Sequence, residues 1–82
     1  MLRRRWIKNQ CNYKLIELQG SVSILSVAKR NDNGVFEIKF NIVCNGFVVG
    51  IYSSYERCQE ILDEILAFIL SKEKYIFEMP KE

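Results

Sequence analysis

The chain has 82 residues, of which 49% are hydrophobic, and a net charge of only +2. This predicts one small globular domain spanning residues 1–82, because disordered chains are poorer in apolar residues and no apolar run reaches the roughly 20 residues that cross a bilayer. The chain contains no histidine, which removes His general bases, Cys–His and Ser–His nucleophile pairs and most zinc sites. We therefore expect no enzyme, no metal and no cofactor.

The three cysteines, Cys11, Cys44 and Cys58, are widely spaced and form no C-x-x-C motif. They are interpreted as reduced core residues, since cysteine is among the most buried residue types. The basic start of the chain is not followed by the apolar segment of a secretory signal. Together these features predict a cytoplasmic protein.

Most of the first two thirds of the chain favours β-strands. Runs at 13–19 and 21–29 are separated at Gly20, and 3–8 is an additional candidate strand. "NDNG" at 31–34 is typical of a tight hairpin turn, since Asn and Gly tolerate a positive φ. Lys29 and Arg30 beside it are interpreted as a polar hairpin end.

The segment 35–43 alternates between apolar and polar residues, which predicts a half-buried strand. A second turn at 44–46 leads to an antiparallel return at 47–52. The alternation predicts four groups of residues that each share a face: Phe36, Ile38, Phe40 and Ile42; opposite these, Glu37, Lys39 and Asn41; then Phe47, Val49 and Ile51; and, opposite these last, Val48 and Tyr52.

A helix is predicted from Tyr55 to about Ser71. Ser53 and Glu56 have the S-x-x-E spacing of a capping box, in which the serine is the N-cap. The helical period places one group of apolar residues on a common face and a group of carboxylates opposite: Cys58, Ile61, Leu62, Ile65, Phe68 and Ile69; and Glu56, Glu60, Asp63 and Glu64.

These elements predict an α+β fold, with an antiparallel sheet of four to six strands and one long amphipathic helix on one face. The tail from Tyr75 to Met79 favours a strand, paired either with the protein's own sheet or with a partner's edge. Adding Tyr55, Leu66 and Leu70 widens the helix's apolar arc to roughly 200°, about twice what one sheet face needs. Because soluble monomers rarely expose large apolar patches, we expect a homo-oligomer.

Charge is unevenly distributed along the chain. Residues 1–54 carry eight Lys/Arg and three Asp/Glu, a balance of +5, whereas residues 55–82 have a balance of −3. Such asymmetry can orient a protein on a polyanion, or bring one end of a protomer to the other end of its neighbour.

Three groups of residues have both a functional and a simpler interpretation. Ser53 and Ser54 with Arg57 could hold a phosphate at the helix N-terminus, although capping alone explains the serines. The cluster Arg3, Arg4, Arg5 and Trp6, with Lys8, could contact nucleic acid, or be a solvated terminus. Glu60, Asp63 and Glu64 could form a metal or acid–base site, or a solvated helix face, which is the simpler interpretation.

The segment from Phe40 to Glu82 resembles small proteins encoded by phages and prophages of Gram-positive bacteria. The shared outline is a strand, then Y-S-[ST]-x-E-[RK]-[AC]-x-x-[IV]-L-x-x-[IL], then a short strand ending near F-x-[MF]-P. Here it comprises Tyr52 to Cys58, Ile61, Leu62 and Ile65, and Phe77 to Pro80. The N-terminal half lacks the opening R-[VL]-x-S-Q-[DN]-G of the first Thoeris anti-defence family, the member of this group with a known role.

The resemblance implies an oligomeric, non-enzymatic protein that sequesters a small nucleotide immune signal, of the cyclic ADP-ribose or cyclic oligonucleotide type, without cleaving it. The host bacterial cytoplasm is then its location. The expected ligand-binding residues are Arg57, Tyr52, Tyr55 and Ser54 at the strand–helix junction, with Arg4 and Arg5 of a neighbouring protomer. The alternative is a small phage protein that binds a host protein or nucleic acid through its basic N-terminal half.

Overall fold

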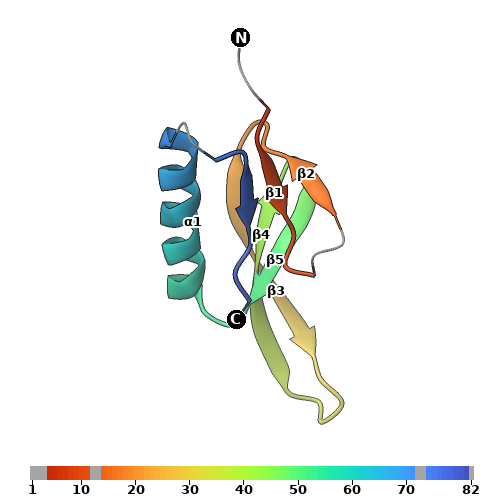
Figure 1. Cartoon of the computed structure of the whole chain (residues 1–82). Helices are drawn as coiled ribbons and strands as arrows, with labels where there is room; N and C mark the ends of the chain where they lie inside the picture. The colour runs from red at the N-terminus through yellow and green to blue at the C-terminus, as the bar shows by residue number, and fades with distance from the viewer. Residues whose placement is uncertain (1–3, 12–13, 72–73, 82) are drawn as a thin grey trace.

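The computed structural model describes residues 4–11, 14–71 and 74–81. It contains six strands and one helix (Figure 1), which confirms the expected α+β fold. In chain order the elements are β1 (Trp6–Lys8), β2 (Leu15–Glu17), β3 (Val22–Arg30), β4 (Phe36–Cys44), β5 (Phe47–Tyr52), α1 (Tyr55–Leu70) and β6 (Ile76–Glu78).

The strands form two sheets, in the orders β2-β1-β6 and β3-β4-β5, rather than one. Gly20, at φ +69°, lies in the turn between β2 and β3, where the chain leaves the first sheet. The tail returns as β6 and pairs with β1 of its own chain, in parallel. That pairing joins segments some 70 residues apart in the sequence, as Trp6 lies opposite Ile76, so no local pattern could have predicted it.

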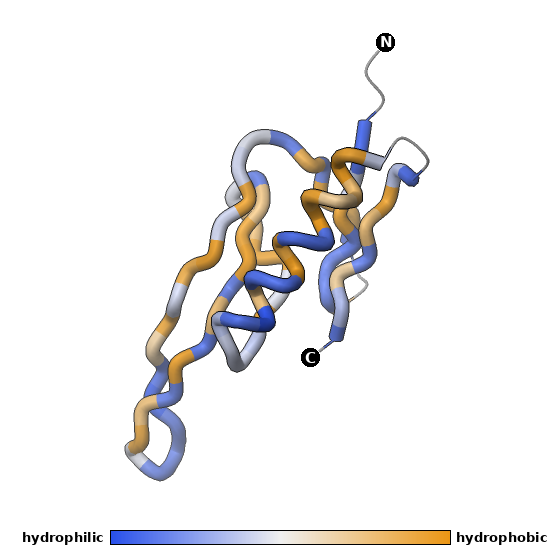
Figure 2. Tube along the Cα trace, turned by 90° about the vertical axis from the view of Figure 1, so that its left-hand side faces the viewer, coloured by the Kyte–Doolittle hydropathy of each residue, from blue (hydrophilic) through white to orange (hydrophobic). Residues whose placement is uncertain are grey.

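The two sheets lie face to face and α1 runs along one side of them (Figures 1 and 2). Each element except β3 and β6 contributes at least one buried side chain to the core, and Met79 closes it from the tail. The residues of this core are Ile7, Ile16, Ile42, Cys44, Val49, Tyr52, Cys58, Ile61, Ile65 and Met79.

The hairpin of β3 and β4 extends beyond this core, and the chain measures 52 × 23 × 20 Å along its principal axes (Figure 1). Exposure rises along one face of β4 toward the hairpin tip, from 0% at Ile42 to 57% at Ile38 and 68% at Phe36. The predicted half-buried strand is therefore covered only at its C-terminal end. Alternation showed which residues share a face, but not how far the rest of the fold covers that face.

A register shift in β5 changes the faces predicted for residues 47–52. Ile42 pairs with Gly50 and Val43 with Val48, so Val49 is an extra residue with no partner on β4. This β-bulge allows both Val49 and Tyr52 to be buried, at 1% and 0% exposure. The bulge therefore buries Val49 with Tyr52 and leaves Val48 exposed with Ile51, whereas simple alternation predicts Val48 with Tyr52 and Val49 with Ile51.

Helix α1 has the predicted extent, but its N-cap is Ser54 rather than Ser53. Ser54 has extended backbone angles, φ −130° and ψ 142°, and its hydroxyl accepts the amide of Arg57 at 3.0 Å. With Ser54 as the N-cap, Glu56 is the second helical residue rather than the third, and its charge in the first turn favours the helix dipole. The buried face consists of Cys58, Ile61, Ile65 and Phe68, all of them predicted.

Candidate functional site

The strand–helix junction, where a ligand was expected, is largely occupied by contacts within the protein. Tyr52 is 0% exposed, and its hydroxyl donates to the carbonyl of Pro80 at 2.6 Å. The sequence predicts that this ring stacks on the base of a ligand. The ring is enclosed by the protein, so this prediction is wrong. Ser54 acts as the helix cap. Tyr55 remains 46% exposed and packs edge-on against Phe40, with 5.8 Å between the ring centroids.

The expected arginines are distributed over opposite ends of the molecule. Arg57 pairs with Glu60 on the helix surface, with 3.1 Å between nitrogen and oxygen. Arg4 lies 3.6 Å from the carboxylate of Glu17 on β2. Tyr52, Ser54, Tyr55 and Arg57 are neighbours along the chain at the junction, but their side chains make separate contacts, and Arg5 lies at the other end of α1. Arg3 lies outside the described residues.

Arg5 has a structural role that the sequence did not reveal. Its guanidinium donates to the carbonyl of Ile69 and, at 3.0 Å, to that of Ser71, at the C-terminal end of α1. It also lies over the ring of Phe68, 5.9 Å from the centroid. The last turn of α1 contains no basic residue of its own. Arg5 therefore supplies both the donors and the positive charge that a helix C-terminus favours.

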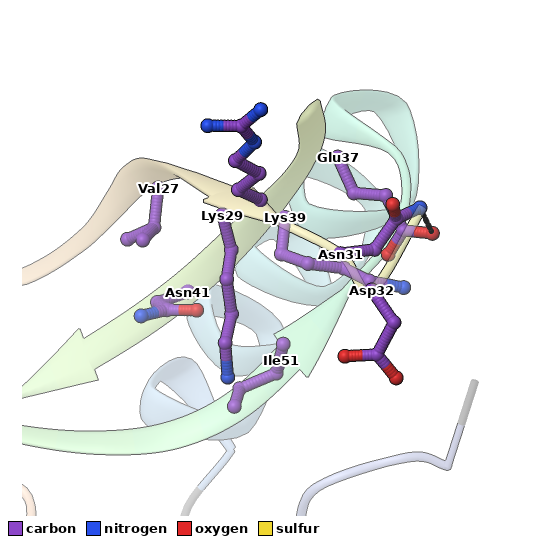
Figure 3. Close-up of a pocket in the computed structure, with 9 residues that line it drawn as sticks. Val27, Lys29, Asn31, Asp32, Glu37, Lys39, Asn41 and Ile51 are labelled. Atoms are coloured by element: carbon purple, nitrogen blue, oxygen red, sulfur yellow. Dashed lines mark hydrogen bonds between the residues drawn. The ribbon is translucent and has the colours of Figure 1, made fainter. Parts of the chain in front are cut away.

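A groove of about 500 Å³ lies on the opposite face of the second sheet from the helix (Figure 3). Val27 and Ile51 give it apolar surface, and Asn31 and Asn41 contribute amides. Its volume lies in the range of roughly 300–1,000 Å³ that is usual for small-molecule sites. The groove combines strands β3, β4 and β5 with the turn that joins the first two, so a folded hairpin is required to form it.

Charged side chains of both signs line this groove. Lys29 and Lys39 come from β3 and β4, and Arg30 and Asp32 lie near the hairpin tip. Glu37 pairs with Lys29 in the strand register, and its carboxylate accepts a hydrogen bond of 3.4 Å from the side-chain amide of Asn31 (Figure 3). Arg30 follows Lys29 in β3, so its side chain lies on the opposite face of the hairpin, and the groove itself holds two ammonium groups and two carboxylates. Either ammonium group can bind an anionic group, while the amides and apolar side chains contact the rest of a ligand.

The groove residues were assigned no function from the sequence. The sequence predicts that Lys39 and Asn41 lie on the solvent side of an amphipathic strand, and that Lys29 and Arg30 form a polar hairpin end. The turn at "NDNG" is the sequence signal that could have identified these residues. A tight turn there pairs β3 with β4 and brings Lys29 opposite Glu37. The contribution of Ile51 depends on the position of β5, which sequence spacing did not give.

The three cysteines are not among the groove residues, and the carboxylates of Glu60, Asp63 and Glu64 lie on the exposed side of α1. Cys44 and Cys58 are buried, as predicted, whereas Cys11 is exposed, so its assignment to the core was wrong. Burial raises the pKa of the Cys44 thiol, an effect partly opposed by a hydrogen bond with the backbone of Gln19. Within residues 4–11, 14–71 and 74–81, no three metal-ligating side chains gather into a cluster. In the same part of the chain, no helix has the length and apolar character needed to cross a membrane.

Comparisons of the chain with protein-family models, with curated proteins and with solved structures each find no match.

Proposed function

We propose that the protein is a non-enzymatic binder that sequesters a small nucleotide, and that the groove between the hairpin and β5 is its binding site. The observation that carries the proposal is that Lys29 and Lys39 line one groove together with the apolar side chains of Val27 and Ile51. A nucleotide needs such a combination, because its phosphates are anionic and its base is flat and largely apolar.

Each part of the groove has a role in this proposal. The ammonium groups of Lys29 and Lys39 bind phosphate oxygens through charge-assisted hydrogen bonds. Val27 and Ile51 contact the base, and the amides of Asn31 and Asn41 provide both donors and acceptors for its polar edge. The carboxylates of Asp32 and Glu37 exclude ligands of high negative charge, which favours a cyclic or otherwise compact nucleotide over a long polyanion.

The biological role that we propose is that implied by the resemblance to phage and prophage proteins. The protein would sequester an immune signal of the cyclic ADP-ribose or cyclic oligonucleotide type in the cytoplasm of the host bacterium. Sequestration without cleavage is consistent with a chain that lacks histidine. It requires only affinity and sufficient protein, since each bound signal molecule is removed from its receptor by mass action.

The groove is a better site than the strand–helix junction for this function. At the junction Tyr52 is buried, Ser54 caps the helix, and Arg57 already pairs with Glu60. The alternative function, macromolecular binding through the basic N-terminal half, has less support because Arg5 is engaged at the end of α1. The experiment below distinguishes this alternative from nucleotide binding.

The test is titration calorimetry with cyclic ADP-ribose isomers and cyclic oligonucleotides on four proteins. These are the native chain, Lys39→Ala, Arg57→Ala and, as a matched control, the exposed lysine variant Lys81→Ala. We expect binding to weaken at least tenfold in Lys39→Ala and to change less than twofold in the other two variants. Recovery of the nucleotide intact after heating the complex checks that it is not cleaved.

Two results would contradict the proposal. Weakened binding in Arg57→Ala with unchanged binding in Lys39→Ala would show that the nucleotide binds at the strand–helix junction instead. Failure of the native protein to bind any nucleotide, together with binding to host nucleic acid or protein, would favour the alternative function.

A further inference from the structure

Strand β3 has an open edge. It is the end strand of its sheet and, in the part of the chain that the structure describes, it pairs with β4 alone. Its nine residues, Val22–Arg30, pair with β4 in continuous register, without a bulge that would twist the edge away. It contains no proline, and its only charged residues are Lys29 and Arg30 at one end. Natural proteins usually protect such edges with charges, proline or bulges, so the first seven residues lack the common protections.

The hairpin turn identifies the backbone groups that point outward from this edge. The amide of Asn31 donates to the carbonyl of Val35, so these two residues form a hydrogen-bonded pair. Hydrogen-bonded and non-hydrogen-bonded pairs alternate along an antiparallel ladder. The N–H and C=O groups of Ile24, Ser26 and Ala28 therefore point away from β4 and toward the open edge.

The other sheet edges differ in ways that limit pairing. The edge of β5 is covered by Gln10, whose side-chain oxygen accepts the amide of Ile51 at 2.9 Å and whose side-chain nitrogen donates to the carbonyl of Ile51 at 3.2 Å. The backbone amide of Gln10 donates to the carbonyl of Val49 at 2.8 Å. The edge strands of the first sheet, β2 and β6, have only three residues each. Strand β3 is thus the long uncovered edge among the described residues.

We propose that β3 pairs with β3 of a second copy of this chain, antiparallel and in a register centred on Ser26. The two three-stranded sheets then form one continuous sheet across a two-fold axis. Of the antiparallel registers, only the one centred on Ser26 pairs all nine residues of both strands, because Ser26 is the midpoint of Val22–Arg30. It also places Ser26 opposite itself and Ile24 opposite Ala28, so the outward backbone groups of both copies meet each other.

Side chains are complementary in this register. Leu25, which is 56% exposed, lies opposite the partner's Val27, and Val27, which is 37% exposed, lies opposite the partner's Leu25. The pairing therefore covers apolar surface on the outer face of the sheet. Lys29 lies opposite the partner's Ser23, and Arg30 opposite the partner's Val22, so like charges do not face each other. A second copy is favoured over an unrelated strand because the sequence of β3 complements itself.

The partner also completes the groove, a consequence that rests on the proposed function. Val27 and Lys29 form the β3 side of the groove, and β3 is the edge strand of its sheet. In the dimer, the partner's Leu25 and Ser23 lie directly beside them. Each groove thereby gains an apolar wall and a hydroxyl, and the assembled pair carries two equivalent sites. Small-ligand sites are common at such seams.

The first test measures mass by light scattering, without ligand, over a dilution series. We expect a native mass of twice 9.7 kDa at high concentration. Leu25→Lys is expected to be monomeric, since it places a charge opposite Val27 in the seam. Its matched control, Leu70→Lys, alters a leucine of α1 that is 74% exposed and is expected to remain dimeric. A monomeric native protein, or a dimer undisturbed by Leu25→Lys, would overturn the proposal whatever the nucleotide titrations show.

The second test examines the register with cysteine variants in a Cys11→Ser background, since Cys11 is the exposed cysteine. In Ser26→Cys the two new thiols lie opposite each other, at a Cα separation of about 5.5 Å that a disulfide can bridge. In the control, Ser23→Cys, the two thiols lie six residues apart along the paired strands, roughly 20 Å. We expect rapid disulfide-linked dimer formation on mild oxidation in Ser26→Cys only. Equal cross-linking of both variants, or none in Ser26→Cys, would overturn the proposed register.

Discussion

The hydroxyl of Tyr52 donates to the carbonyl of Pro80 at 2.6 Å, which fastens the C-terminal tail to the second sheet. Tyr52 is 0% exposed, so this hydrogen bond forms away from water. Tyr52→Phe leaves the carbonyl without this donor, and we expect it to lower the free energy of unfolding by about 1 kcal/mol. Urea denaturation measures the change. Tyr55→Phe, at a tyrosine that is 46% exposed, is the control, and an equal loss in both variants would contradict this role.

Gly50 leaves space for the same tyrosine ring. A Cβ placed on Gly50 would lie 2.6 Å from Cε2 and 2.8 Å from the hydroxyl oxygen of Tyr52, closer than real Cβ atoms approach. Gly50→Ala is therefore expected to cost about 1–3 kcal/mol through overpacking. In a Tyr52→Leu background, which removes the atoms in question, the same substitution should cost less. Additive losses in the double variant would show that this contact is not the cause.

Replacing the helix cap tests the start of α1. Ser54→Ala removes the hydroxyl that accepts the amide of Arg57, and we expect a loss of about 1 kcal/mol in thermal or urea unfolding. Ser53→Ala is the matched control, since the capping-box spacing had assigned the cap to that residue. A larger loss in Ser53→Ala than in Ser54→Ala would support the assignment made from the sequence instead.

Arg5 is expected to stabilise the other end of the helix. Arg5→Met retains an unbranched apolar side chain but removes the donors to the carbonyls of Ile69 and Ser71. We expect a loss of about 1–2 kcal/mol that diminishes with added salt. The control is Arg4→Met, because Arg4 is 75% exposed beside Glu17 and surface pairs contribute little, about 0–1 kcal/mol. Equal losses would argue against Arg5 as a helix cap.

Burial of Cys44 predicts a change in stability at alkaline pH. Because burial raises the pKa of this thiol, the folded state retains its proton at a pH where the unfolded chain releases it. The stability that Cys44 contributes is therefore fully present below the usual thiol pKa and is lost as pH rises through the raised pKa. The free energy of unfolding, measured by urea between neutral and alkaline pH, should fall more steeply in the native protein than in Cys44→Ala.

Local patterns predicted most of the fold. The helix, the turn at 31–34 and the strands of the first two thirds follow from period, propensity and turn residues, which act over a few residues. The division into two sheets depends on pairings between distant segments, such as β1 with β6, and these leave no local signal. The sequence predicts Ser53 as the N-cap, whereas the structure has Ser54. Two adjacent serines carry the same hydroxyl, and only the backbone angles show which one caps the helix.

The candidate site was harder to predict than the fold. Tyr52 was expected to face a ligand, but the bulge at Val49 and the returning tail bury it. Lys39 and Asn41 were correctly placed on the polar face of a strand. Sequence spacing could not show that Ile51 lies on the same face and completes a concave surface with them. Sites built from three strands require the tertiary arrangement, whereas a motif on one element can be recognised directly.

The most direct test of nucleotide binding in the groove is an NMR titration of the ¹⁵N-labelled native protein with a cyclic ADP-ribose isomer or a cyclic dinucleotide. We predict saturable shifts in the amide resonances of Lys29, Lys39, Asn41 and Ile51. The resonances of Arg57 and Glu60 should move little, because the junction lies on the other face of the sheet. Shifts confined to Tyr55 and Arg57, or no shift with any nucleotide at saturating concentration, would contradict the account.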